Sequence, residues 1–239
     1  MKDSGTPGQP PGGEGQSLGD WLRRARLGEP GPGLPFWTRL VFFLFLGLVM
    51  GTGLDAFHVF TGTARYCNIP LIPGLNVAIY VPFEFMAAGA VVGTVRPVLD
   101  SRFGGPRSRL SLWAAVGGLL FLGAAWAGSG AISCICWAGG NVPDPPVCTR
   151  DPNMFFLLVL LSAGGAFWYW LDRTTEGIVV AFFTGGMGVG IELFLIHVTK
   201  TYRYTYGDLF GVPSWLPALY FIAAGAIGNF GRFLRQPTG

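Results

Sequence analysis

Six long apolar segments dominate this chain of 239 residues and restrict it to one class of protein. Each approaches or exceeds the roughly 20 residues that a helix needs to cross the hydrocarbon core of a bilayer. Only 12% of the residues are charged, against about 25% in an ordinary soluble domain. So much apolar surface has to face lipid, because so few ionic side chains cannot cover it. The sequence therefore predicts an all-α, polytopic membrane protein.

The six predicted spans form one transmembrane domain over residues 36–235. Helices are expected because every backbone polar group in lipid has to be paired within its own segment or within a closed barrel, and no alternation of period two supports a barrel. Short connections favour antiparallel packing of consecutive helices. The spans are Trp37–Phe60, Asn76–Leu99, Leu110–Trp137, Met154–Leu171, Gly177–Thr199 and Ser214–Leu234.

Residues 1–35 contain no apolar run, so they show no cleavable signal peptide. Their Gly, Pro and polar content cannot bury enough surface to offset chain entropy, which predicts a disordered tail. One piece of the tail, residues 20–27, combines Trp21 and Leu22 with Arg23, Arg24 and Arg26. Two readings stay open for this piece: short amphipathic turns on the membrane surface, or a continuation of the flexible tail.

Lys and Arg are distributed unequally over the two sides of the six predicted spans. Of the 16 such residues, 12 lie on the side of the two termini. Only Arg65, Arg150, Lys200 and Arg203 lie on the other side. The excess of positive charge predicts that both termini are cytoplasmic.

All four cysteines then lie on the external side: Cys67, Cys134, Cys136 and Cys148. An external face is oxidising, so one or two disulfides are predicted, with three ways to pair four cysteines. A bridge from Cys67 to the second external loop is the favoured pairing. Zinc is the weaker reading because Cys134 and Cys136 lack a second pair at metal spacing, and we expect no metal.

Small residues recur at helical spacing within the spans. Gly47 with Gly51 and Gly89 with Gly93 are two such pairs, and Gly231 ends a similar series in the last span. This spacing permits close contact between helices in a membrane.

Five ionisable residues interrupt the apolar spans: Asp55, His58, Glu84, Glu192 and His197. Such residues are costly in a membrane and point toward a protein interior, a cavity or a functional site. With the orientation above, all five fall in the outer half of the bundle. They predict a polar pocket there, beside a kink in the second span at Pro82. Interfacial or packing roles are the alternative, especially for the two histidines.

Several motifs resemble those of the Insig family of sterol-responsive membrane regulators, and together they cover about Leu40 to Leu234. In the second half they are Trp168-Tyr169-Trp170-Leu171-Asp172-Arg173 with Gly177, Tyr202 to Asp208 with Tyr204 and Thr205, Ser214-Trp215-Leu216-Pro217, and Gly228-Asn229-Phe230-Gly231-Arg232. Val81-Pro82, Ala90 to Gly93, and Leu99-Asp100-Ser101 followed by Pro106 precede them.

The resemblance implies a six-helix fold with both termini in the cytosol, in agreement with the distribution of charge. It also implies a regulator that binds a lipid within the membrane; animal members bind oxysterol and retain the sterol sensor Scap. Asp172 matches the aspartate that members need to hold Scap, although an Asp at a helix start also caps free amides. The matched positions predicted to serve a partner or the fold are Asp100, Asp172, Arg173, Tyr204, Asp208, Trp215, Asn229 and Arg232.

This chain departs from the animal pattern near the expected sterol. Phe155 stands where animal members have a glutamine, and Glu84 with Phe85 replaces a cysteine pair. A different head group is therefore expected, as in a sterol or diacylglycerol-like lipid. The residues predicted for the lipid cavity are Asp55, His58, Pro82, Glu84, Phe155 and Glu192.

The leading hypothesis is a non-enzymatic lipid-binding regulator that uses no cofactor, binds no nucleic acid, and contacts another membrane protein or copies of itself. A prokaryotic plasma membrane is favoured, and the endoplasmic reticulum applies if the source is eukaryotic. One alternative is a small-solute or proton-coupled transporter that uses Glu84, Glu192 and Asp55. A metal enzyme is the weakest alternative, since the chain carries one Asp-x-x-His pair where such bundles repeat Glu-x-x-His.

Overall fold

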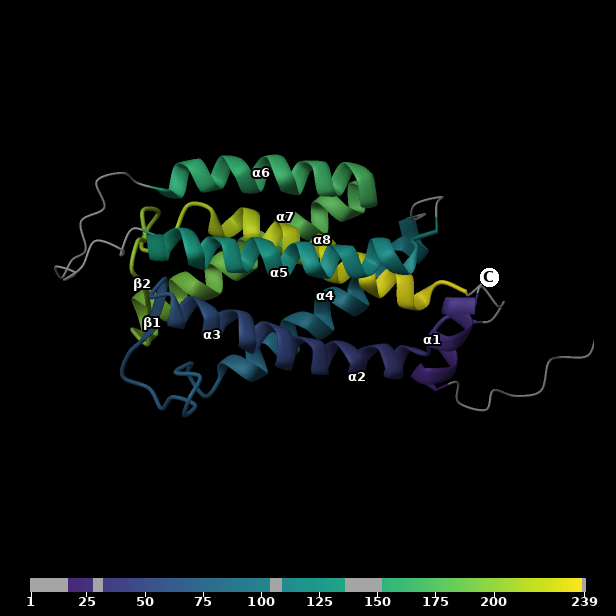
Figure 1. Ribbon diagram of the computed structural model, residues 1–239, viewed down its shortest axis with the longest axis horizontal. Helices are drawn as coiled ribbons and strands as arrows, with labels where there is room; N and C mark the ends of the chain where they lie inside the picture. The colour runs from purple at the N-terminus through teal and green to yellow at the C-terminus, as the bar shows by residue number, and fades with distance from the viewer. Residues whose placement is uncertain (1–16, 28–31, 104–108, 136–151, 238–239) are drawn as a thin grey trace, which may run out of the picture.

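The computed structural model describes residues 17–27, 32–103, 109–135 and 152–237. Helices account for almost all of the regular structure in these residues (Figure 1). A short helix α1 (Leu18–Leu27) comes first, and α2 (Phe36–Leu46), a π-helical turn (Gly47–Gly51) and α3 (Thr52–Phe60) then form one continuous rod. The remaining helices are α4 (Val81–Phe103), α5 (Leu112–Ile135), α6 (Pro152–Leu171), α7 (Thr175–Phe194), which continues as a π-helical turn (Leu195–Thr199), and α8 (Leu216–Arg235).

Four of these helices are long and apolar enough to cross a membrane. They are the α2–α3 rod, α5, α6 and α7 with its π-helical end. α4 and α8 coincide with the other two predicted spans and carry more charge, including Arg96, Asp100 and Arg232. The described chain thus has a mainly helical, membrane-type fold. The crossing of all six helices and the cytoplasmic orientation of both ends stay predictions.

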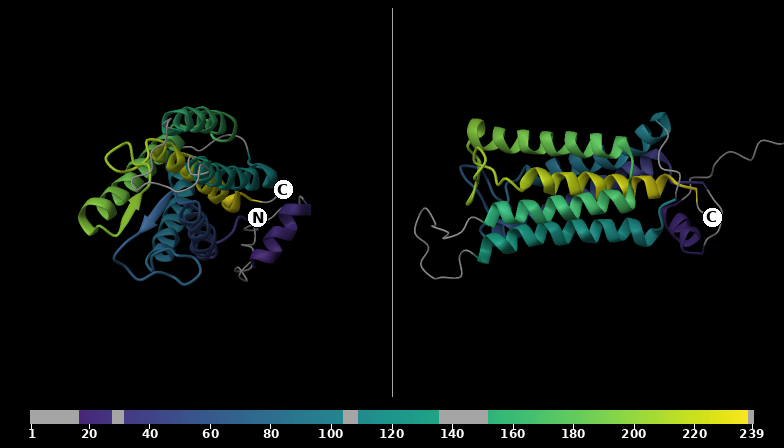
Figure 2. Two further views of the ribbon diagram at one scale, coloured as in Figure 1. Left: turned by 60° about the vertical axis from the view of Figure 1, so that its left-hand side comes forward. Right: turned by 90° about the horizontal axis from the view of Figure 1, so that it is seen from above.

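α8 is the central helix of the bundle. It packs against α4, α5, α6 and α7, and Figure 2 shows it running between its neighbours. Small residues such as Ala223, Ala224 and Ala226 on α8 are buried. Without bulky side chains at these positions, four helices can approach the same axis.

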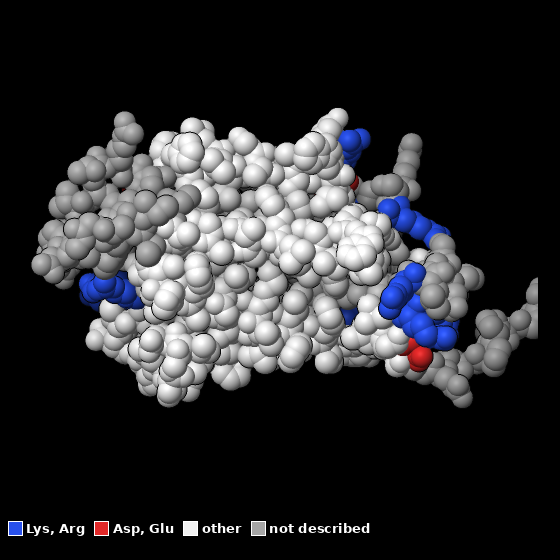
Figure 3. All heavy atoms as spheres, in the orientation of Figure 1, with Lys and Arg blue, Asp and Glu red and all other residues white. Residues whose placement is uncertain are grey.

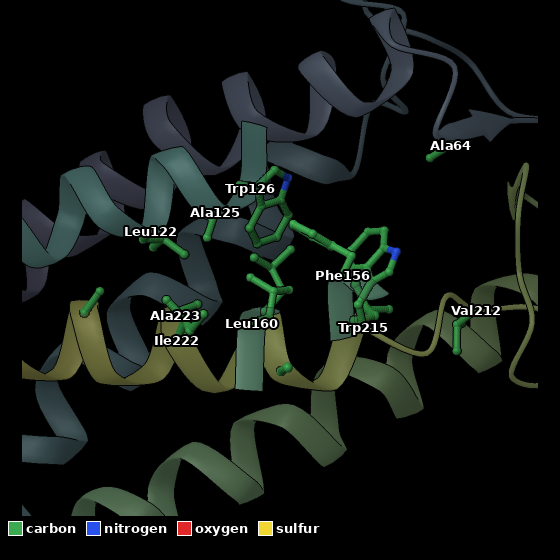
Figure 4. Packing of buried hydrophobic residues seen from close by; sticks show 14 of the residues in the cluster. Ala64, Leu122, Ala125, Trp126, Phe156, Leu160, Val212, Trp215, Ile222 and Ala223 are labelled. Carbon is green, nitrogen blue, oxygen red and sulfur yellow. The ribbon is translucent and has the colours of Figure 1, made fainter. Parts of the chain in front are cut away.

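The largest apolar core lies in the half of the bundle where α8 begins. Trp126 from α5, Phe156 and Leu160 from α6, and Trp215 and Ile222 beside or on α8 converge there (Figure 4). The ring centroids of Phe156 and Trp215 are 5.8 Å apart in an edge-to-face arrangement. Aromatic pairs of this geometry contribute packing energy beyond the area that they bury.

The two ends of the bundle are built differently. One end, which the distribution of charge predicts to be external, is called the outer end, and the opposite end is called the inner end. At the outer end, β1 (Ala64–Tyr66) pairs antiparallel with β2 (Tyr202–Tyr204), and this pairing joins the segment after α3 to the segment after α7. At the inner end, α1 packs against the end of α8, with the rings of Trp21 and Phe233 5.0 Å apart. The described parts next to both termini therefore lie at this inner end, which the sequence predicts to be cytoplasmic.

Glycines bring the α2–α3 rod against α4. A Cβ atom added to Gly47 would lie 2.0 Å from the Phe85 carbonyl oxygen, and one added to Gly89 would lie 2.7 Å from the Phe43 carbonyl oxygen. α8 also approaches α4 closely, since a Cβ at Gly231 of α8 would lie 2.1 Å from the Gly93 carbonyl oxygen. The predicted close contacts through small residues are present at these positions.

The second predicted span begins later than expected. Residue Asn76 lies in a turn with a φ of 57°, and α4 starts only at Val81. Pro82 thus occupies the first helical turn, where its missing N–H removes no helical hydrogen bond. The predicted kink at Pro82 is wrong for this reason, and the proline inside the helix is Pro97.

Substitution of Gly47 by Ala should destabilise the protein by about 1 to 3 kcal/mol, because the added methyl group has no room beside the α4 backbone. The matched control is Gly53→Ala, since a Cβ at Gly53 meets nothing within 4 Å. Thermal unfolding in mild detergent measures both variants. Equal unfolding temperatures would contradict the close approach of the two helices.

Candidate functional site

An apolar cavity of about 80 Å³ lies at the centre of the bundle. The α2–α3 rod and helices α4, α5, α7 and α8 all contribute to its wall, and the polar groups in the wall belong to Trp126, Thr184 and Tyr220. The other lining residues are apolar: Leu46, Gly47, Met50, Gly51, Leu54, Phe85, Ala88, Gly89, Val92, Leu122, Ala223, Ala224 and Ile227. Since Ala88 is also exposed on the surface of the bundle, the cavity approaches the surrounding lipid at α4.

A carboxylate adjoins the cavity through Tyr220. The Tyr220 hydroxyl donates a hydrogen bond of 2.8 Å to Oε1 of Glu192, and the Tyr204 hydroxyl donates one of 3.2 Å to the same oxygen. Glu192 is 8% exposed. Among the described residues, its second oxygen, Oε2, has no hydrogen-bond partner, and neither has the indole nitrogen of Trp126. Tyr220 contacts both residues, since its hydroxyl donates to Glu192 and its ring centroid is 6.1 Å from that of Trp126.

Two further carboxyl groups belong to the same outer region. Asp55 is buried and accepts a 2.7 Å hydrogen bond from the Tyr66 hydroxyl. Burial and the neighbouring Asp55 carboxylate raise the pKa of Tyr66, so this hydroxyl stays protonated and acts as the donor. Asp55 and Glu84 both interact electrostatically with Glu192. The structure thus gathers three of the predicted cavity residues, Asp55, Glu84 and Glu192, just outside the outer end of the cavity.

The other predicted cavity residues lie elsewhere. His58 is 1% exposed, and its Nε2 lies 2.8 Å from the Ser129 hydroxyl and 3.1 Å from the Trp126 carbonyl oxygen. This position matches the packing role that the sequence also allowed. Phe155 on α6 is 67% exposed and faces outward, while Pro82 is at the start of α4. Sequence reasoning missed Trp126 and Tyr220, because an aromatic residue in an apolar span looks like ordinary core.

A second hollow, of about 480 Å³, lies among α6, α7 and α8. Glycines line much of it, including Gly164 and Gly165 of α6 and Gly185 and Gly186 of α7. Its polar lining group, the indole nitrogen of Trp168, already donates to the Thr174 carbonyl oxygen at 3.2 Å. This hollow therefore offers apolar contact without a free hydrogen-bonding group on a described side chain.

Four charged residues form a buried network at the inner end. Arg96 lies 2.7 Å from Asp172 and 3.2 Å from Asp100, and Arg232 lies 2.7 Å from Asp100 and 3.2 Å from Asp172. The side chains of the two arginines and Asp172 are 3 to 4% exposed. Two positive and two negative groups thus alternate around one closed set of contacts, which links α4 and α8 to the turn between α6 and α7.

Neighbouring polar groups complete this network. Thr174 donates to Asp172 and accepts from Arg96, and Arg232 donates to the Asn229 side chain at 2.6 Å. The Thr174 hydroxyl also accepts from the Gly177 amide at 3.1 Å, which makes Thr174 the N-cap of α7. Asp172 binds the arginines instead, so the capping role that the sequence allowed for Asp172 belongs to Thr174. Sequence reasoning did not single out Arg96 as a member of the network. Its i, i+4 spacing from Asp100 was the signal that could have identified it.

Three of the remaining motif residues, Tyr204, Asp208 and Trp215, lie near the outer end, and Arg173 lies at the inner end. The Asn153 amide nitrogen donates to Oδ1 of Asp208 at 2.8 Å, and its oxygen accepts from the Trp215 indole at 3.0 Å. Asp208 also accepts from the Ser214 amide at 2.7 Å. These bonds fix the entry into α8. Arg173 is exposed at the inner end, where its guanidinium carbon lies 4.2 Å from the ring centroid of Tyr169.

The predicted disulfide stays a prediction. Cys67 is a free, partly exposed thiol. Cys136 and Cys148 lie outside the described residues, as does the side chain of Cys134. The described residues contain no group of His, Cys, Asp and Glu side chains that could hold a metal ion.

Comparisons with known proteins show which proteins this chain is similar to. No family model matches the sequence. The insulin-induced gene 1 protein of Homo sapiens is 26% identical over 221 residues, which cover 89% of this chain and 74% of that protein. Its counterpart from Xenopus laevis is 30% identical over 174 residues, which cover 70% of this chain and 62% of that protein. The chain is an Insig-like protein.

Solved structures support the same fold. The crystal structure of MvINS, an Insig homologue from Mycobacterium vanbaalenii, aligns with a TM-score of 0.66 at 19% identity and covers 82% of this chain and 94% of that chain. A cross-linked MvINS trimer aligns equally well. The Insig-like chain is accordingly a multi-pass integral membrane protein.

Replacement of Asp172 by Ala should lower the free energy of unfolding by about 3 to 5 kcal/mol. The reason is that Arg96 and Arg232 stay buried but lose one of the two carboxylates that they share, which leaves their positive charges only partly compensated. Glu176→Ala is the control, because it removes a partly exposed carboxylate four residues later and should cost at most about 0.5 kcal/mol. Chemical or thermal unfolding in detergent compares the two. A similar, small loss in both variants would show that the network contributes little.

Proposed function

We propose that this Insig-like protein is a non-enzymatic lipid-binding regulator that holds a sterol or diacylglycerol-like lipid inside its helical bundle. One observation carries the proposal. An apolar cavity inside a membrane bundle is lined by Trp126, whose Nε1 has no partner among the described residues, and by Tyr220, which donates to Glu192, whose Oε2 also has no described partner.

A lipid hydroxyl suits this pair of groups. A hydroxyl both donates and accepts, so a single hydroxyl group can accept from Trp126 and donate to Glu192. Buried polar groups without partners are costly, and a ligand that satisfies both would gain that energy on binding. Phosphate fits poorly, because three carboxyl groups, Asp55, Glu84 and Glu192, lie in this region. A neutral head group with one or two hydroxyls therefore matches the outer end of the cavity.

The apolar remainder of the lipid would occupy the cavity and continue toward the membrane. A space of about 80 Å³ accommodates a segment of an acyl chain or ring system. The rest would extend past the exposed Ala88 into the bilayer. The larger hollow among α6, α7 and α8 can take an apolar chain as well, but Trp168 is already bonded there and nothing on the described side chains would recognise a head group.

Regulation would follow from the helices that meet at the cavity. A ligand shifts an equilibrium only as far as it binds one arrangement better than another. A lipid that contacts Phe85 on α4 and Tyr220 on α8 would favour one relative position of these helices, and the same two helices meet in the Arg96–Arg232 network. The partner that responds would be another membrane protein or further copies of this chain, as in the MvINS trimer. A bacterial plasma membrane fits this homologue.

Lipid retained through mild purification is the first measurement. Mass spectrometry should find a neutral hydroxylated lipid at close to one copy per chain, and adding that lipid should raise the unfolding temperature. Glu192→Gln should weaken binding by about twofold to tenfold, because it replaces a carboxyl oxygen by an NH2 group that cannot accept a hydrogen bond, and one such bond contributes about 0.5 to 1.5 kcal/mol. Glu176→Gln, at the inner end of the same helix, should leave binding unchanged.

The absence of both stoichiometric lipid and a thermal shift would overturn the proposal. The buried carboxyl groups favour one competing function, proton-coupled transport, and that function predicts a different result. Solute flux into liposomes that Glu84→Gln abolishes would support the transporter instead.

A further inference from the structure

A third hollow, with a more polar wall than the other two, lies at the inner end, between α1, the start of α5 and the end of α8. It measures about 370 Å³, and α1 contributes Trp21 and Arg26 to its wall. Arg109 to Trp113 line the opposite side, and the rest of the wall comes from Phe233, Gln236 and Pro237. Among the described lining residues, none carries a carboxylate.

Positive charge at this hollow is not neutralised by the described protein. Arg26 and Arg109 are both exposed, and neither pairs with a carboxylate among the described residues. Figure 3 shows most of the visible Lys and Arg side chains at this end of the molecule, with an acidic group beside them, and a smaller basic group at the opposite end. Arg39 does not line the hollow; it is 6% exposed, it is repelled by Arg235, and two of its guanidinium nitrogens have no partner in the described part of the chain.

Trp21 is the buried aromatic residue that α1 contributes to the wall of the hollow. Trp21 is 1% exposed, and its indole nitrogen has no hydrogen-bond partner among the described residues. The ring itself is fixed by the edge contact with Phe233 at 5.0 Å.

The position of the hollow places it at the membrane interface. Trp113 at the start of α5 is 82% exposed beside it, and an exposed Trp at the end of an apolar helix is typical of the level of the lipid head groups. Leu112 and Trp113 begin the apolar run of α5, so a molecule bound between the two arginines would have lipid-facing surface directly next to it. The cytoplasmic leaflet, toward which this end is predicted to point, carries anionic lipids.

We propose that this hollow binds the phosphate head group of an anionic phospholipid from the inner leaflet. Arg26 and Arg109 hold the phosphate from α1 and from the start of α5. The acyl chains run along Trp113 into the bilayer. The bound lipid joins α1 to the bundle, because its two arginine ligands come from separate elements.

The test uses the full chain in detergent, titrated with short-chain phosphatidylglycerol and with phosphatidylcholine of the same chain length. Native mass spectrometry or thermophoresis measures binding. Phosphatidylglycerol should bind more tightly, and the double variant Arg26→Gln/Arg109→Gln should weaken it about 25-fold, about fivefold for each arginine near the membrane surface. Binding should also weaken as salt is raised.

The matched control, Lys200→Gln/Arg203→Gln, removes two exposed charges from the outer end. It should leave phosphatidylglycerol binding unchanged, and both double variants should unfold at the wild-type temperature without lipid. Glycerol phosphate without acyl chains should bind far more weakly, which distinguishes a lipid from a free anion. Equal binding of the two lipids, or equal losses in the two double variants, would overturn the proposal.

Discussion

The buried ionic network of Arg96, Asp100, Asp172 and Arg232 is the constraint on which the arrangement of the bundle depends. An isolated charge inside a membrane bundle is too costly to keep, whereas two positive and two negative groups in mutual contact offset much of that cost. The contacts satisfy these groups only when α4, α8 and the α6–α7 turn occupy their observed positions. The network therefore selects one arrangement of helices that packing of small and apolar side chains alone would leave less defined.

Polarity divides the molecule into three levels. Charge pairs lie at the inner end, tyrosine–carboxylate bonds lie at the outer end, and the cavity between them is almost wholly apolar. α8 connects all three levels, since it carries Tyr220 near its start and Asn229 and Arg232 near its end. A change in the helix positions around the cavity would consequently be felt in the ionic network. This is the physical basis for expecting a lipid to act on the inner surface of the protein.

Glycines have two opposite consequences in this fold. Where two small-residue faces meet, as at Gly47 and Gly89, the helices approach so closely that a methyl group has no room. Where glycines of α6 and α7 lie without such contact, as at Gly165 and Gly186, a hollow remains between the helices. The same residue type thus gives either tight packing or an open space, and the separation of the helix axes decides which.

The sequence by itself determined the class of fold and the approximate limits of the long helices, because lipid leaves the backbone few alternatives to a helix. It also determined the close contact at Gly47 and Gly89, since the spacing of small residues is a local property. Tertiary structure decided which buried polar groups meet. Asp172 looked equally suited to capping α7, but Arg96, 76 residues away, and Arg232, 60 residues away, hold it in the ionic network. His58 and Phe155 were predicted to line a cavity. The observed rotation of their helices instead directs His58 against α5 and Phe155 toward the outside of the bundle. The rotation of each helix about its axis depends on the shapes of all its neighbours, and no single apolar segment contains that information.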